Sequence, residues 1–285
     1  MESDTGPRTA ADVGEPLLAA LRGLGKGGLL VVTGAGVSVA SGIPTFRGND
    51  PGAIWKRDVT ELGTLRYFKA DPVGSWTWYQ QRFAAALGAR PNPAHLALAA
   101  LERWQVGRGG DFLLVAQNID TLHEQAGSRR LIKVHGSVDK LRCRREGCRF
   151  GALSGSLRRE EVDVARFERD PSAETLPRCP ECRNLLRQHV LWFDEVYTSH
   201  ADYGWEQVLD AVARMRLVLC VGTSFSVGVT DLVSGAARAA GLPVFSIDPN
   251  GPPGAREPHV TYLQARAEEL LPRVCAELDT DQIQR

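Results

Sequence analysis

The chain has 285 residues, 43% of them hydrophobic, and its 34 basic and 34 acidic side chains balance to a formal net charge of +0. A chain of this size can enclose one substantial core and a smaller module. Its neutral balance argues against nucleic-acid binding through a general basic field, and no apolar stretch approaches the length of a membrane span. Residues 1–14 lack the apolar core of a signal peptide. We therefore expect a cytoplasmic protein.

Short apolar runs recur along the chain, each ahead of a polar or glycine-bearing turn. These runs are Leu29–Thr33, Phe112–Ala116, Leu217–Gly222 and Pro243–Ile247. Helical spacing fills the intervals, at Trp76–Leu87, Pro93–Trp104, Tyr203–Met215 and Val229–Ala240. The alternation predicts an α/β protein with a Rossmann-like, doubly wound parallel sheet covered by helices on both faces. Ligand-binding residues should then follow the carboxyl ends of the strands.

A glycine-rich turn follows the first apolar run. The segment Gly34–Ser38 reads like the phosphate-binding turn that opens a dinucleotide fold, where the N–H groups of a helix face a phosphate. The third glycine of a hydride-transferring enzyme is missing, and a loop with Ile43, Phe46 and Arg47 stands in its place. Such a loop suits closure over a nucleotide. Taken alone, the two glycines would fit an ordinary tight turn equally well.

Four of the six cysteines form two close pairs. Cys143 and Cys148 make the first pair, and Cys179 and Cys182 make the second some thirty residues later. Two such knuckles suit tetrahedral zinc, and four thiolates make a closed site, so the metal should be structural. The alternative is four unrelated reduced cysteines.

The segment around these cysteines is rich in arginine and only weakly periodic, which is typical of an inserted module. We expect a zinc-binding small domain at 136–189, inserted into a Rossmann-like domain at 15–135 and 190–278, with flexible termini at 1–14 and 279–285.

Six motifs, taken in order, point to one family. They are Gly34–Ser38, Gly42–Arg47, Gln117–Asp120, His135-Gly136, the four cysteines and Gly222–Ser224. Together they resemble the sirtuins, NAD-dependent protein lysine deacylases, over residues 29–272. The resemblance implies a Rossmann-like domain, a small zinc-ribbon domain with one structural zinc, and a cleft between them. NAD, as co-substrate, and an acylated lysine side chain would enter this cleft from opposite sides.

The resemblance also implies three catalytic residues. In the family's reaction the acyl oxygen displaces nicotinamide from the ribose, and a histidine then activates a ribose hydroxyl. His135 matches this base, and an imidazole titrates near neutral pH. Asn118 and Asp120 match residues of the nicotinamide pocket, where an amide and a carboxylate can orient the carboxamide and hold a water.

The nucleotide contacts implied by the resemblance are more numerous. They are Gly34, Ala35, Gly36, Ser38, Ile43, Phe46, Arg47, Gln117, Asn118, Ile119, Asp120, Gly222, Thr223, Ser224, Asp248, Asn250 and Ala267. Arg47 would contact phosphate, and the ring of Phe46 would shield the reactive carbon from water. The family commonly has asparagine at the position of Asp248. A carboxylate there can accept hydrogen bonds from both ribose hydroxyls and repels a phosphate, which predicts NAD rather than NADP.

Tyr79 and Arg82 bear on the acyl group. They lie three residues apart in a helical stretch, hence on one face, and resemble the Tyr-x-x-Arg pair of the class III sirtuins, which remove succinyl, malonyl and glutaryl groups. Gly52–Trp55 also resembles that class. An arginine fork and a hydroxyl donor would hold an acidic acyl end, whereas the alternative is an amphipathic helix surface. We predict removal of succinyl and malonyl as well as acetyl groups, with nicotinamide and O-acyl-ADP-ribose as products.

The segment expected to pair with the substrate peptide departs from the family. The peptide should add as a strand between two segments, contacting Val190, Phe193, Asp194 and Glu195 on one side and Val227 on the other. The family's usual Phe-Gly-Glu is Phe193-Asp194-Glu195 here, and the usual proline of the second segment is absent. Aspartate in place of glycine restricts the backbone and adds a charge.

Two other functions remain open. The same scaffold could serve as an NAD hydrolase or ADP-ribosyltransferase, in which another nucleophile captures the ribose. A nonenzymatic module could instead grip nucleic acid or a partner through Arg142, Arg144, Arg145 and Arg149. We expect acylated lysines of proteins as the substrates, neither nucleic acid nor membrane as a partner, and a monomer.

Overall fold

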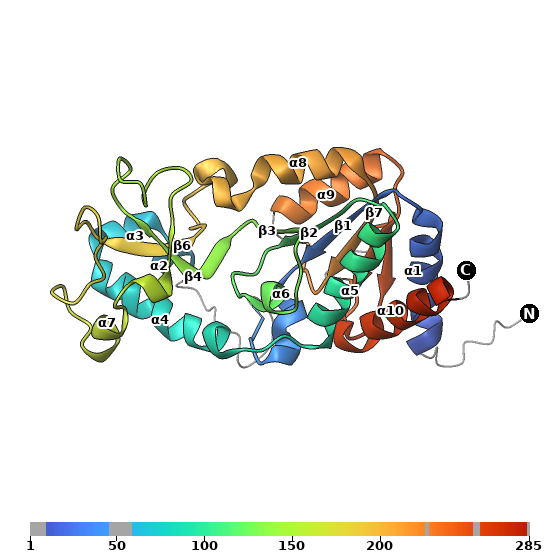
Figure 1. Ribbon diagram of the computed structural model, residues 1–285, viewed down its shortest axis with the longest axis horizontal. Helices are drawn as coiled ribbons and strands as arrows, with labels where there is room; N and C mark the ends of the chain where they lie inside the picture. Colours follow the sequence, from blue (N-terminus) through green and yellow to red (C-terminus); the bar gives the residue numbers. More distant parts are fainter. Residues whose placement is uncertain (1–9, 46–58, 226–227, 253–256, 284–285) are drawn as a thin grey trace, which may run out of the picture.

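The computed structural model describes residues 10–45, 59–225, 228–252 and 257–283. Two packed units divide these residues, a larger one built on a six-stranded sheet and a smaller one that carries the cysteines (Figure 1). Within the described residues, none of the helices combines the length and the apolar character needed to cross a bilayer.

The large sheet has the order of a doubly wound fold. Its strands are β1 (Gly28–Thr33), β2 (Phe112–Ala116), β3 (Leu131–Lys133), β7 (Met215–Val221), β8 (Val244–Ile247) and β9 (Val260–Leu263). They pair in the order β3-β2-β1-β7-β8-β9, and every pair is parallel. The strand order therefore reverses between β1 and β7, where such sheets place their ligands. The predicted α/β class and parallel sheet are confirmed.

Helices cover both faces of this sheet, because neighbouring side chains of each strand point to opposite sides. Leu29 and Val31 of β1 pack under α1 (Ala10–Leu24), α5 (Pro93–Gly107) and α10 (Ala267–Ile283). Leu30 and Val32 pack under α8 (Trp205–Arg214) and α9 (Gly228–Ala239) on the other face (Figure 1). The short helices η1 (Ala35–Ser41) and α6 (Leu122–Gln125) follow the carboxyl ends of β1 and β2.

The expected flexible termini overlap two of these helices. Residues 10–14 belong to α1 and residues 279–283 to α10. Tertiary packing explains this: Gly14 of α1 lies so close to α10 that a β-carbon there would be 3.0 Å from Leu270. Leu278 is 1% exposed in the same core, so the last turns of α10 are held by buried apolar surface.

The smaller unit surrounds an antiparallel sheet of three strands. It contains β4 (Gly136–Cys143), β5 (Leu157–Arg158) and β6 (Leu186–Val190), in the order β5-β4-β6. Its helices are α2 (Val59–Leu62), α3 (Leu65–Ala70), α4 (Pro72–Gly88), η2 (Arg159–Glu161) and α7 (Ala165–Arg169). Two short turns, η3 (Tyr197–Ser199) and η4 (Ala201–Tyr203), lead the chain back to α8.

Helices α3 and α4 pack with this smaller sheet, whereas the expected division placed them in the Rossmann-like domain. Phe68 and Trp76 are fully buried in one core with Leu141 and Leu186. The indole N–H of Trp76 also donates to the carbonyl of Leu186 at 2.9 Å. The periodicity of a helix shows that it has an apolar face but not which sheet receives that face.

Candidate active site

Two glycine turns meet at the point where the strand order reverses. Gly36 N–H donates to the carbonyl of Gly222 at 2.9 Å, and Gly34 N–H donates to that of Val221 at 3.0 Å. A β-carbon on Gly36 would lie 2.7 Å from the Cα of Gly222, whose own φ is +57°. Side chains cannot fit at this junction, so the two turns pack backbone against backbone at the carboxyl ends of β1 and β7.

Three of the residues expected around nicotinamide form one hydrogen-bonded group. Ser38 donates through Oγ to Asp120 Oδ2 at 2.9 Å, and Asn118 donates through Nδ2 to Ser38 Oγ at 2.9 Å. The other carboxylate oxygen of Asp120 accepts from the Leu122 N–H at 3.1 Å. Ser38 and Asp120 are buried, so this group fixes amide and carboxylate positions at the carboxyl ends of β1 and β2.

A second group ties β2 to β7 and α9. Gln117 donates through Nε2 to Thr223 Oγ1 and to Thr230 Oγ1, each at 3.1 Å. Thr230 has no counterpart among the expected site residues. A single threonine in the first turn of a helix carries no signal of a partner more than a hundred residues away, so only the fold identifies it.

His135 lies beside these groups, between β3 and β4. Its Nδ1 is 2.6 Å from the carbonyl oxygen of Gln117 and its Nε2 is 3.4 Å from Tyr197 Oη. A carbonyl can only accept, so Nδ1 carries the proton and Nε2 presents a lone pair. Burial lowers the pKa of His135, and the Gln117 carbonyl opposes this by raising it. The imidazole is thus neutral, and basic at Nε2, at physiological pH.

The expected site residues lie where the two units join. Ile43 and Ile119 are partly buried against the core of the smaller unit, and the Val138 N–H of β4 donates to the carbonyl of Ile119 at 2.8 Å. Gly136 permits the sharp transition, because its φ is +82° and a β-carbon would lie 2.2 Å from the carbonyl oxygen of His189. Several functional groups therefore depend on the same domain junction.

The remaining residues expected to contact the nucleotide lie in different parts of the large unit or outside the described residues. Asp248 directly follows β8, and its Oδ1 accepts from the Asn250 N–H at 2.9 Å. Ala267 begins α10 with its methyl group buried in the core of the large unit, so this side chain faces the core. Ala35 begins η1, and Ser224 is exposed after Thr223. Phe46, Arg47, Val227 and Gly52–Trp55 lie outside the described residues.

Glu195 is held inside the protein, in contrast to its expected contact with substrate. Its carboxylate pairs with Arg187 at 2.6 Å and with Arg142 at 2.8 Å, and also accepts from the Trp192 N–H at 3.1 Å. Burial by itself would raise the pKa of Glu195, but the hydrogen bonds and charges of the two arginines hold it below its ordinary value. With its oxygens occupied, the Glu195 side chain fixes this segment, and a peptide contact through the Glu195 backbone stays a prediction.

Asp194, the residue in place of the family glycine, holds the start of α3. Its two carboxylate oxygens accept from the N–H groups of Leu65 at 2.7 Å and Arg66 at 3.1 Å. The neighbouring Phe193 N–H donates to the carbonyl of Gly63 at 3.0 Å, while the Phe193 ring is 47% exposed and Val190 is buried. An anion at a helix N-terminus is favourable, which gives the unexpected aspartate a structural role.

We expect Asp194→Ala to lower the free energy of unfolding by about 1–2 kcal/mol, because the first N–H groups of α3 lose their acceptor. Urea titration followed by tryptophan fluorescence measures this. Asp194→Asn retains an oxygen acceptor and should recover part of the loss. If the alanine variant unfolds at the wild-type urea concentration, the proposed capping role is wrong.

Tyr79 and Arg82 both lie on α4, within an aromatic cluster. The ring of Tyr79, 4% exposed, stacks on Trp192 at 6.1 Å and contacts Phe83 at 5.2 Å. Arg82 lies over the Trp78 ring at 4.0 Å and donates to the Trp78 carbonyl at 3.2 Å. Burial raises the pKa of the Tyr79 phenol, so it stays a neutral donor. The alternative, that the two residues form an exposed helix surface, does not apply to Tyr79, because Tyr79 is buried.

The four thiols converge as a zinc site requires. Their sulfur atoms all lie within 4.8 Å of one another, with Cys143 to Cys182 at 3.5 Å and Cys148 to Cys179 at 3.6 Å. Zinc–sulfur bonds of about 2.3 Å in a tetrahedron place the sulfur atoms about 3.8 Å apart. The described thiols thus fit a structural zinc bound by four cysteines, with no position left for a substrate.

A second group of potential metal ligands is already engaged by the protein. The donor atoms of His189, His200 and Asp202 lie within 4.8 Å of one another. However, Asp202 Oδ2 accepts from Lys140 Nζ at 2.9 Å and from Ser156 Oγ at 3.1 Å, and the Asp202 N–H donates to His200 Nδ1 at 3.1 Å. Burial lowers the pKa of His189 to about 4. These contacts form a network of one ion pair, Lys140 with Asp202, and two neutral histidines, and the network fixes the returning chain.

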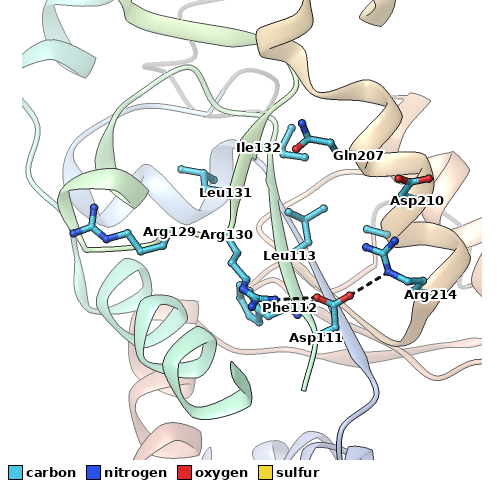
Figure 2. Close-up of a pocket in the computed structure, with 11 residues that line it drawn as sticks. Asp111, Phe112, Leu113, Arg129, Arg130, Leu131, Ile132, Gln207, Asp210 and Arg214 are labelled. Carbon is cyan, nitrogen blue, oxygen red and sulfur yellow. Dashed lines mark hydrogen bonds and ion pairs between the residues drawn. The ribbon is translucent and has the colours of Figure 1, made fainter. Parts of the chain in front are cut away.

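A cavity of about 320 Å³ lies at the opposite end of the strands (Figure 2). Asp111, directly before β2, pairs there with Arg130 at 3.0 Å and Arg214 at 3.3 Å. Asp111 and Arg214 stand at the amino ends of their strands, far from the carboxyl ends that carry His135. This cavity therefore lies among the ion pairs of Asp111, at the end of the sheet away from the expected site residues.

The fold and site define a class: a two-unit protein with a glycine turn at a strand-order reversal and a smaller unit whose four cysteines fit a structural zinc. The chain belongs to the Sir2 family, whose model matches residues 34–229. The sirtuin resemblance is thereby confirmed.

Named relatives and solved structures agree with this membership. NAD-dependent protein deacylase 2 of Pyrobaculum aerophilum is 37% identical, over 87% of this chain and 90% of its own length. NAD-dependent protein deacylase 1 of Pseudomonas aeruginosa is 39% identical, over 86% and 92%. A crystal structure of a Sir2 homolog–NAD complex superposes with a TM-score of 0.74, at 32% identity and 94% coverage of each chain. A mutant Sir2 homologue in complex with ADP-ribose gives 0.76, at 31% identity, covering 94% of this chain and 98% of its own.

Proposed function

We propose that the protein is an NAD-dependent protein lysine deacylase. The observation that carries this proposal is the junction at Gln117: its carbonyl holds His135, and its side chain holds the threonines of β7 and α9. A base and a nucleotide crevice are thus joined through one residue. Family membership and the names of the relatives support the same activity.

Each group of the site then has a proposed role in the reaction. The glycines of the Gly34–Gly36 turn would let a phosphate approach the backbone closely, and the group formed by Ser38, Asn118 and Asp120 would hold nicotinamide. His135, through Nε2, would accept the proton of a ribose hydroxyl. Asp248 would accept hydrogen bonds from the adenosine ribose and so favour NAD over NADP. The zinc would hold the smaller unit without taking part in the reaction.

The test is incubation of the purified protein with NAD and matched acetyl-lysine and succinyl-lysine peptides, with nicotinamide and peptide followed by mass spectrometry. Peptide-dependent nicotinamide release with an O-acyl-ADP-ribose product is expected. Nicotinamide release in the absence of acyl peptide would identify an NAD hydrolase or ADP-ribosyltransferase instead. We further propose that the protein acts as a cytoplasmic monomer.

We also propose that acidic acyl groups, succinyl and malonyl, are preferred over acetyl. Tyr79 and Arg82 support this preference, since they supply a neutral hydroxyl and a guanidinium from one helix. Tyr79 stacks on Trp192, next to the segment expected to receive the peptide. A carboxylate that enters this partly desolvated region needs such partners.

Arg82→Met is expected to lower the rate of succinyl removal by about 10- to 100-fold, the value of a charge-assisted pair of roughly 1.5–3 kcal/mol, with little change for acetyl. Initial rates on the two matched peptides measure the ratio. Arg82→Lys keeps the charge without the guanidinium fork, and its rate of succinyl removal should lie between those of the wild type and Arg82→Met. Because Arg82 also packs on Trp78, thermal unfolding of each variant is the control. Equal losses for both acyl groups would contradict the assignment.

A further inference from the structure

Tyr197 lies against His135 although the proposed reaction assigns it no role. It begins η3, two residues after Glu195 in the segment that returns the chain to the large unit. Its ring stacks on that of Trp205 with centroids 4.3 Å apart and planes 7° apart. It also lies nearly parallel to the imidazole of His135, at 5.9 Å and 16°. The phenol ring thus contacts both the first residue of α8 and the proposed base.

The hydroxyl of Tyr197 completes a chain of hydrogen bonds. The Val229 N–H, in the first turn of α9, donates to Tyr197 Oη, which directs the phenol proton elsewhere. His135 Nε2 is 3.4 Å from this oxygen, a long hydrogen bond, and its lone pair can accept that proton. At the other side of the ring, Nδ1–H donates to Gln117 at 2.6 Å. The chain therefore runs from α9 through both rings to β2.

We propose that Tyr197 is a positioning residue for His135. The Tyr197 hydroxyl donates to Nε2 of His135, holds the imidazole in its Nδ1-protonated form, and occupies the hydrogen-bonding position at Nε2 until a substrate hydroxyl replaces it. The inference rests on the proposed function only for the role of His135 as base. The orientation of the imidazole by Tyr197 stands on the contacts alone.

The charges around the pair are compatible with this direction of donation. Among the described residues, burial lowers the pKa of His135 and the Gln117 carbonyl raises it. Burial raises the pKa of Tyr197, the Val229 N–H opposes this, and Asp231 on α9 adds to the rise. The phenol therefore stays protonated, and its proton remains available to Nε2.

A hydrogen bond to the neutral imidazole lowers the pKa of the imidazole, because the bond is lost when Nε2 is protonated. Tyr197→Phe keeps the stacked ring and removes the hydroxyl. We expect the pKa of His135 to rise by about half a unit to one unit, the net value of one hydrogen bond. NMR titration of the histidine ring protons measures this, with His135→Gln used to assign the signal. The acid limb of kcat/KM should move upward by the same amount.

The matched control is Tyr67→Phe on α3 of the smaller unit, which removes a hydroxyl that donates to Asp71 and should leave the titration of His135 unchanged. Tyr197→Leu, which loses both ring and hydroxyl, must show the same upward direction. An unchanged His135 titration in both Tyr197 variants overturns the inference. If the titration shifts but the protein does not remove acyl groups, the proposed function fails while the positioning by Tyr197 stands.

Discussion

His135→Ala is expected to reduce peptide deacylation by at least about 100-fold, the usual contribution of a positioned general base. In the proposed reaction the base acts after nicotinamide has left. The exchange of free labelled nicotinamide into NAD should therefore remain measurable while acyl removal is lost. Initial rates of both processes on one acyl peptide separate the two steps.

The pH dependence follows from the same residue. Because burial lowers the pKa of His135, its neutral form persists below the ordinary histidine value of about 6.5. Activity that depends on this base should fall only as the pH drops through that lowered pKa, so the acid limb of kcat/KM is expected below about pH 6.5. His259→Ala, on the loop before β9, is the control and should keep the wild-type rate and profile.

In the exchange experiment, equal loss of nicotinamide exchange and deacylation in His135→Ala would contradict the assigned step.

Removal of the metal is expected to unfold the smaller unit. Structural zinc binds zinc-finger peptides with apparent free energies of about 10–16 kcal/mol, comparable to the whole stability of a typical domain of about 5–15 kcal/mol. Cys179 is one of the four thiols and is fully buried. Cys179→Ser should therefore lose zinc, measured by elemental analysis, together with the cooperative thermal transition of this unit.

Cys275→Ala is the matched control for the zinc experiment. Cys275 lies in α10, where its thiol donates to the Ala97 carbonyl at 3.3 Å, so its loss should leave the metal content unchanged. Deacylation should fall with zinc, because β4 starts directly after His135 and its strand-to-strand pairing holds that residue. A Cys179→Ser protein with full zinc content would show that these thiols do not form the site.

Local patterns accounted for the elements around the site. Apolar runs ahead of polar or glycine-bearing turns placed β1, β2, β7 and β8, because a buried parallel strand needs continuous apolar residues and its turn does not. The expected helices correspond to α4, α5, α8 and α9. The short strand β9 was not predicted, since four residues give too little periodicity.

The sequence by itself determined the α/β class, the four zinc ligands and the motifs that place the chain among the Sir2 proteins, because each is a pattern of residue types at short, fixed spacing. Tertiary structure alone decided that Asp194 caps α3, 129 residues earlier in the chain, and that Glu195 pairs with Arg142, 53 residues earlier. It likewise placed Tyr197 against His135, 62 residues away. Contacts of this kind depend on how two units pack, and burial and charge pairing across that junction leave no periodic trace in the chain.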